Sequence, residues 1–182
     1  MDVNDEALAL AAAGGDREAF AKVLELHYDR LFAICFRMMG NAADAEDLLQ
    51  DICLKLPTKL RGFRGEAKLT TWLYRVAVNA AHDRRRRQQS RGKANAGWGE
   101  WEILQRADTD TSQARVAWLH RAMSKLPESL RDTLALVFDD LTHADVAKIL
   151  GVSEGTVSWR ISKAKERLRA AKAEEEADDE RL

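Results

Sequence analysis

The segment from Leu141 to Arg169, LTHADVAKILGVSEGTVSWRISKAKERLR, constrains the fold more than any other part of the chain. Its second half carries an apolar stripe at spacings of 4, 3 and 4, formed by Val157, Ile161, Ala164 and Leu168. This spacing places the stripe on one side of a helix. Gly151 interrupts the helical pattern ahead of it and supplies a turn. The segment therefore predicts two helices joined by a tight turn.

The details of this segment match a helix-turn-helix, the motif that lays its second helix in the major groove of DNA. Thr142 and Ser153 are suited to cap the two helices, and Ala147 is small where the helices must approach closely. A self-standing repressor usually has an apolar anchor where this chain has Arg160, so a long recognition helix, basic to its end, is expected. The side chains expected near DNA are Glu154, Thr156, Ser158, Trp159, Arg160, Ser162 and Lys163.

Trp159 is the unusual member of this set. At about 100° per residue, Trp159 points away from the apolar stripe. A buried tryptophan would instead lie on that stripe. Trp159 is therefore either an isolated surface aromatic or one half of a contact with another molecule.

Charge is strongly segregated along the chain, although the net charge is only −1. Arg84 to Lys93 and Arg160 to Lys172 each hold six cations, with a single acid, Glu166, in the second run. Acids gather instead in NAADAEDLLQD, residues 41–51, and in the tail EEEADDE, residues 174–180. Two basic patches and a separate acidic helix favour phosphate and a basic surface as partners, with solvated charged faces as the alternative.

The fold class is predicted to be all-α, because helical periodicity dominates and no run alternates like a strand. In the first half, Asn4 and Asp16 are expected to cap helices, Gly14 and Gly40 to stop them, and Pro57 to end or kink a third helix. The predicted organisation is two small helical domains on a flexible linker: a first domain over 1–89, the linker over 90–111, a helix-turn-helix domain over 112–173 and an acidic tail over 174–182.

The sequence carries no motif for catalysis, a metal or a cofactor. It has no glycine-rich phosphate loop and no His-Cys cluster, and Cys35 and Cys53 are interpreted as free thiols without chemistry. No apolar run approaches the ~20 residues of a membrane span. The first residues, MDVNDEALAL, are acidic rather than basic as in a signal peptide, so a cytoplasmic protein without membrane insertion is expected.

Two segments resemble one known family in the order and with the linker that the family has. GVSEGTVSWRISKAKERLR, preceded by LPESLRDTLALVFDDLTHADVAKIL, is similar to region four of the extracytoplasmic-function sigma factors, promoter-specificity subunits of bacterial RNA polymerase. NAADAEDLLQDICLKL and FRGEAKLTTWLYRVAVNAAHDRRRR are similar to their region two. Together the matches cover roughly three quarters of the chain.

The resemblance implies a function, partners and site residues. It implies that Asp47, Gln50 and Asp51 bind the clamp helices of the largest subunit of core polymerase. Region four would contact the flap of the polymerase. The opened minus-ten element would lie along the flank of Trp72, Arg75, Asn79 and His82, although Trp72 itself is expected to be mostly core. The full minus-ten set is Arg64, Lys68, Arg75, Asn79, His82, Arg84 and Arg85. The predicted recognition helix would read the minus-thirty-five element, and an anti-sigma factor is an expected inhibitor.

Some positions depart from the family pattern. Pro57 stands where a large aromatic is common, Lys68 and Thr70 replace more usual loop residues, and Ser158 and Trp159 stand where a basic and a small polar residue are frequent. Two alternative functions stay open: a stand-alone helix-turn-helix regulator that dimerises through its first domain, and a sigma-like decoy that binds only an anti-sigma factor.

Overall fold

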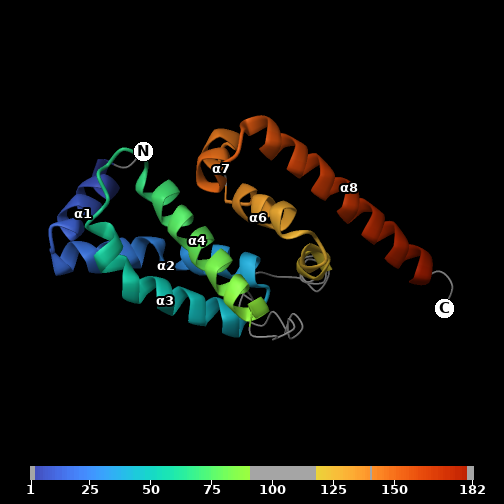
Figure 1. Cartoon of the computed structure of the whole chain (residues 1–182), viewed down its shortest axis with the longest axis horizontal. Helices are drawn as coiled ribbons and strands as arrows, with labels where there is room; N and C mark the ends of the chain where they lie inside the picture. The colour runs from blue at the N-terminus through green and yellow to red at the C-terminus, as the bar shows by residue number, and fades with distance from the viewer. Residues whose placement is uncertain (1–2, 91–117, 140, 180–182) are drawn as a thin grey trace, which may run out of the picture. The chain divides into compact units, whose positions relative to one another are not determined.

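The computed structural model describes residues 3–90, 118–139 and 141–179 of the chain. Every regular element within these ranges is a helix, which confirms the predicted all-α class. The chain divides into two compact units, one built on α1 to α4 and the other on α6 to α8 (Figure 1). The predicted linker lies, apart from Ser90 at the end of α4, outside the described residues.

The N-terminal unit consists of α1 (Val3–Ala13), α2 (Arg17–Met39), α3 (Ala42–Leu60) and α4 (Leu69–Ser90). Asp16 caps α2 by accepting hydrogen bonds from the backbone N–H groups of Glu18 at 2.9 Å and Ala19 at 3.1 Å, as predicted. Gly40 directly follows α2 with φ +86, a backbone conformation in which other residues are strained, so it stops the helix as expected.

The core of this unit is formed by long aliphatic side chains from α2, α3 and α4. Its fully buried members include Leu31, Ile34, Met38, Leu48, Leu49, Ile52, Leu56, Leu60, Leu69 and Leu73. Because Leu48, Leu49, Ile52 and Leu56 share one side of α3, the opposite side of that helix is left for polar residues.

The structure differs from the predictions at two helix ends. The α3 helix does not end at Pro57 but continues to Leu60. Pro57 lies in the last turn, where it removes only one backbone hydrogen bond, and the burial of Leu56 and Leu60 on either side holds that turn in place. Asn4 lies inside α1, which begins at Val3, so it does not cap the helix.

The C-terminal unit contains a helical segment over residues 118–124, then α6 (Glu128–Val137), α7 (His143–Leu150) and α8 (Glu154–Asp179). Pro127 stands at the N-cap of α6 with φ −51, within the range that the proline ring allows. A core cluster of Met123, Leu126, Leu130, Leu134 and Ala164 joins three of these helices, with Leu119 and Leu168 packed against it. The α8 helix extends through residue 173 into the predicted acidic tail.

Candidate functional site

One polar surface of the N-terminal unit is the acidic face of α3. The apolar residues on one side of this helix, Leu48, Leu49, Ile52 and Leu56, are all buried. On the other side, Asp47 and Gln50 are exposed and Asp51 is half-buried. The three predicted polymerase-binding residues therefore share one accessible helix face. We call Asp44, Asp47, Gln50 and Asp51 the acidic face.

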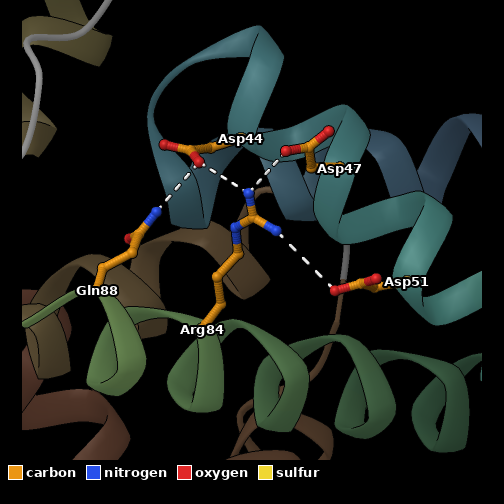
Figure 2. Close-up of polar contacts among 5 residues, drawn as sticks. All are labelled: Asp44, Asp47, Asp51, Arg84 and Gln88. Atoms are coloured by element: carbon orange, nitrogen blue, oxygen red, sulfur yellow. Dashed lines mark hydrogen bonds and ion pairs between the residues drawn. The ribbon is translucent and has the colours of Figure 1, made fainter. Parts of the chain in front are cut away.

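Arg84 of α4 reaches the acidic face, which the sequence had not predicted (Figure 2). Its Nη2 donates hydrogen bonds to Asp44 Oδ1 at 3.0 Å and Asp47 Oδ2 at 2.9 Å, and its Nη1 lies 3.9 Å from Asp51 Oδ2. Gln88, one turn further along α4, donates from Nε2 to the same Asp44 oxygen at 3.1 Å. One arginine thus contacts three carboxylates that come from successive turns of α3.

The charge of Arg84 is secured by these contacts. Burial by itself lowers the pKa of Arg84, but the hydrogen bonds to Asp44 and Asp47 and the charges of both outweigh it and raise the pKa above its ordinary value. Arg84 is therefore a permanent cation among the acids, and its side chain is 22% exposed.

The opposite flank of α4 presents the residues predicted to meet the minus-ten strand. Arg75, Asn79 and His82 are exposed, and the structure brings them together along one side of the helix. Trp72, expected to be mostly core, is partly buried and makes an edge contact with the buried Phe63, with ring centroids 5.6 Å apart. The tryptophan thereby packs the preceding loop against the start of α4 while keeping part of its ring accessible.

The loop before α4 carries the remaining minus-ten candidates. Arg64 and Lys68 are exposed there, on either side of Gly65, whose φ of +72 allows a sharp change of chain direction. Arg85, by contrast, is 7% exposed. The basic tetrad of α4 is thus not a uniform DNA-facing patch, because Arg84 contacts acids and Arg85 is buried, whereas the side chain of Arg86 is 80% exposed.

The C-terminal unit has the predicted helix-turn-helix geometry. Thr142 Oγ1 accepts a hydrogen bond from the backbone N–H of Asp145 at 3.1 Å, and Ser153 Oγ accepts one from Thr156 at 3.1 Å, so both predicted caps are confirmed. Gly151 adopts φ +66 between the helices, and Ala147 is 6% exposed at their contact. Each residue singled out for the turn performs the predicted structural task.

The recognition helix α8 buries the predicted stripe and exposes the side opposite to it. Val157, Ile161 and Ala164 are buried, whereas Trp159 is 62% exposed. Of the other minus-thirty-five candidates, Glu154, Ser158 and Ser162 are exposed, and Thr156, Arg160 and Lys163 are half-buried. All seven residues lie in the first three turns of α8, together on its accessible side or flanking it.

Two contacts restrict the polar side chains of this helix. Lys163 Nζ donates to both carboxylate oxygens of Glu166 at 2.8 Å, and this ion pair lowers the pKa of Glu166. Ser158 Oγ lies 3.1 Å from His143 Nδ1 at the start of α7. The spacing of three residues between Lys163 and Glu166 is a sequence signal that would have indicated the first contact.

The acidic end of α8 also has a partner within its own unit. Glu175 accepts a hydrogen bond from the indole Nε1 of Trp118 and lies 3.7 Å from Arg121 Nη2. Both partners come from the helical segment ahead of α6. Part of the acidic tail therefore helps to hold the long helix against its own unit.

Potential metal ligands and thiols are the remaining groups with chemical potential. Over residues 3–90, 118–139 and 141–179, no group of three or more His, Cys, Asp or Glu is arranged to hold a metal ion. Both cysteines are free thiols, as interpreted from the sequence, and burial followed by the charge of Cys53 raises the pKa of Cys35 to about 12. A thiol with that pKa is a poor nucleophile at neutral pH.

The described helices define an all-helical protein with a helix-turn-helix in its second unit, and comparison with known proteins identifies the family. Residues 23–91 match the family model of sigma-70 region 2, and residues 117–168 match that of sigma-70 region 4. The ECF RNA polymerase sigma factor SigM of Mycobacterium tuberculosis is 32% identical, with 91% of this chain and 83% of SigM covered. The chain belongs to the ECF sigma factors of RNA polymerase.

Other relatives and solved structures agree with this assignment. The ECF RNA polymerase sigma factor SigW of Bacillus subtilis is 29% identical, with 85% of this chain and 89% of SigW covered. The structure of CnrH in complex with the cytosolic domain of CnrY has a TM-score of 0.68 at 23% identity, covering 92% of this chain and 96% of CnrH. The sigma factor RpoE in complex with the anti-sigma factor NepR from Bartonella quintana has a TM-score of 0.69 at 24% identity, covering 83% of this chain and 94% of RpoE.

Membership of this family establishes the general function. A sigma factor binds core RNA polymerase and directs it to promoters, and the stand-alone regulator is not favoured because both family regions match in order. None of the helices within the described ranges has the length and apolar character needed to cross a membrane.

Proposed function

We propose that this sigma factor works through three separate surfaces. The acidic face of α3, with Asp47, Gln50 and Asp51, binds the clamp helices of the largest polymerase subunit. The exposed flank of α4 and the loop before it bind the opened minus-ten strand. The N-terminal turns of α8 bind the minus-thirty-five element in the major groove, and the C-terminal unit also contacts the polymerase flap.

The observation that carries this proposal is the separation of charge within the N-terminal unit. The carboxylates of Asp47 and Asp51, which are 64% and 49% exposed, would repel DNA and suit a basic protein surface. Arg75 and Asn79 are exposed on a different helix and offer the cation and amide that a single strand needs. One small unit can then bind a protein and a nucleic acid at once without like charges meeting.

Within the predicted minus-ten set, the structure supports the loop and flank residues more strongly than the two arginines of the tetrad. Arg64, Lys68, Arg75, Asn79 and His82 are exposed and remain our candidates for strand binding. The predictions for Arg84 and Arg85 are supported less well, because the first already contacts aspartates and the second is buried.

We propose further that an anti-sigma factor holds the protein inactive. Two proteins of the same fold were solved as complexes: CnrH with the cytosolic domain of CnrY, and the sigma factor RpoE with the anti-sigma factor NepR. Trp159 offers such an inhibitor an exposed aromatic anchor on the DNA-binding helix, and tryptophan is enriched among residues that dominate protein interfaces. An inhibitor that covers it would block promoter binding at the same time.

The protein acts in the cytoplasm and catalyses no reaction itself. Promoter opening draws on binding energy, and the polymerase performs the chemistry, so no cofactor is required. The location follows from the polymerase and the DNA that a sigma factor must reach.

Run-off transcription tests the proposed function. The full-length chain is mixed with core polymerase and with promoter fragments selected by the reconstituted holoenzyme. We expect transcripts that depend on the added chain and on intact minus-ten and minus-thirty-five elements. DNA binding without transcripts would indicate a stand-alone regulator, and neither binding nor transcripts would indicate a decoy.

A further inference from the structure

Arg84 belongs to the acidic face rather than to the DNA flank of α4. At ~100° per residue it projects on nearly the opposite side of α4 from Arg75 and His82. Its guanidinium contacts two of the proposed polymerase-binding residues, Asp47 and Asp51 (Figure 2). The α4 helix thus offers one side to DNA and supports a protein-binding surface with the other.

The exposure of the groups shows where Arg84 lies relative to a partner. The Arg84 side chain is 22% exposed, whereas those of Asp47 and Asp51 are 64% and 49% exposed. The guanidinium therefore lies beneath the carboxylates, on the α4 side, and leaves their outer surfaces to solvent. A basic partner that arrives from solvent meets the aspartates without first displacing the arginine.

The contacts divide the three carboxylates into one that anchors Arg84 and two that remain available to a partner. Asp44 Oδ1 accepts from both Arg84 and Gln88, and the Asp44 side chain is the least exposed of the three at 31%. Asp47 uses only Oδ2 for its hydrogen bond to Arg84. Asp51 is held by an ion pair at 3.9 Å, beyond hydrogen-bond distance. Asp44 anchors the arginine, and the other two keep oxygens for a partner.

Arg84 also offsets the repulsion that this arrangement creates. Asp44, Asp47 and Asp51 follow one another at spacings of three and four residues, which makes their side chains neighbours on a helix. Without a cation, like charges at these spacings repel and favour rotamers that spread apart. Binding would then have to order each side chain, at a typical cost of ~0.5–1.5 kcal/mol apiece.

We propose that Arg84 is a positioning residue for polymerase binding, which holds Asp47 and Asp51 in the orientation that the basic partner surface meets. The inference rests on the proposed function of the acidic face. It assigns the first arginine of the basic tetrad to the protein interface, acting through the aspartates rather than through contact with polymerase or DNA.

The test measures the affinity of the full-length chain for core polymerase by fluorescence titration. Arg84→Met removes the donors but keeps an aliphatic stem, and Arg84→Lys restores a cation without the planar fork. We expect Arg84→Met to weaken binding about 5- to 150-fold, as the loss of two ordered side chains implies. Arg84→Lys should recover part of this loss. Arg86→Met is the matched control, because Arg86 is exposed and forms a local ion pair with Asp83 at 2.8 Å, and it should bind as the wild type does.

Three readouts separate positioning from other roles. Circular dichroism at the titration temperature must show that Arg84→Met is folded. If Arg84→Met is unfolded, a second variant, Gln88→Met, perturbs the same hydrogen-bond network more mildly and takes its place. In a double-mutant cycle of Arg84→Met with Asp47→Asn, the two losses of polymerase-binding free energy should not be additive. At saturating core polymerase, the Arg84→Met holoenzyme should open promoters as the wild type does, since Arg84 does not face the DNA.

The outcomes are distinguishable from failure of the proposed function. If Asp47→Lys with Asp51→Lys leaves polymerase binding intact, the acidic face is not the interface and the proposed function fails there. If that pair abolishes binding while folded Arg84→Met binds normally, only the positioning role is refuted. Tighter binding by Arg84→Met would show that the arginine competes with the polymerase, and an opening defect at saturation would place it on DNA; either result overturns the proposal.

Discussion

Replacing Trp159 with alanine should affect recognition and leave the fold unchanged. The side chain is 62% exposed and lies on the side of α8 opposite the buried stripe. A tryptophan presents at most roughly 250 Å², so on the order of 150 Å² remains for a partner. Covered completely, this area would contribute about 4 kcal/mol at 25 cal/mol per Å². A groove contact that covers a quarter to a third of it would contribute about 1 kcal/mol.

The two possible partners of Trp159 predict different losses. If the ring packs on a thymine methyl or a sugar edge, Trp159→Ala should lose about fivefold discrimination at one position of the minus-thirty-five element. If the ring anchors an anti-sigma factor, the variant should keep its promoter selectivity but escape inhibition. In both cases the free energy of unfolding should change by less than about 0.5 kcal/mol, as is usual for an exposed substitution.

The assay compares wild type and Trp159→Ala as holoenzymes on single-base variants of the minus-thirty-five element, with and without cell extract. The control is Glu174→Ala, which changes an exposed polar residue on the same helix outside the minus-thirty-five set and leaves the aromatic surface in place. Identical selectivity profiles for wild type and Trp159→Ala in both conditions would refute the reasoning, and the tryptophan would then be an isolated surface aromatic.

The remaining predictions concern charge. Asp47→Lys with Asp51→Lys should weaken core-polymerase binding by several kcal/mol in a pull-down while promoter binding by the C-terminal unit persists, because cations would face a basic surface; unchanged assembly would count against the clamp assignment. Arg75→Ala with Asn79→Ala should preserve the closed complex but reduce permanganate reactivity of the minus-ten thymines, and full reactivity would contradict this. Glu166→Gln frees Lys163 to contact a phosphate, so the slope of the logarithm of the promoter-binding constant against the logarithm of salt concentration should steepen by about 0.9. An unchanged slope would show that Lys163 does not reach phosphate.

The helix-turn-helix could be predicted almost completely from the sequence because each of its positions answers a local demand. A cap needs a short side-chain oxygen, a left-handed turn needs glycine, and a close helix contact needs a small residue. Thr142, Gly151 and Ser153 meet those demands within a few residues of the groups they serve. No distant part of the chain had to be known to interpret them.

The N-terminal site was predictable only in part. Charge segregation and the family resemblance pointed to Asp47 and Asp51, but the charge count treated RRRR as part of one basic patch. The partners of Arg84 lie 37 and 40 residues earlier in the chain, so local pattern could not reveal them. The α3 helix continues past Pro57 for a related reason, since the tertiary burial of the last turn outweighs the local preference of proline.

Helical spacing along α4 nevertheless indicated which way Arg84 points. Arg84 and Gln88 continue the side of the helix that holds the buried Ala77 and Ala81, so both point toward the rest of the unit rather than toward DNA. An arginine on a core-facing side needs acids within reach, because burying an unpaired charge is costly. The spaced aspartates of the preceding helix are the acids that the described contacts supply. The Asp47 and Asp51 carboxylates that suit a basic partner therefore also contact Arg84 of α4, which ties the polymerase-binding surface to the helix that carries the DNA flank.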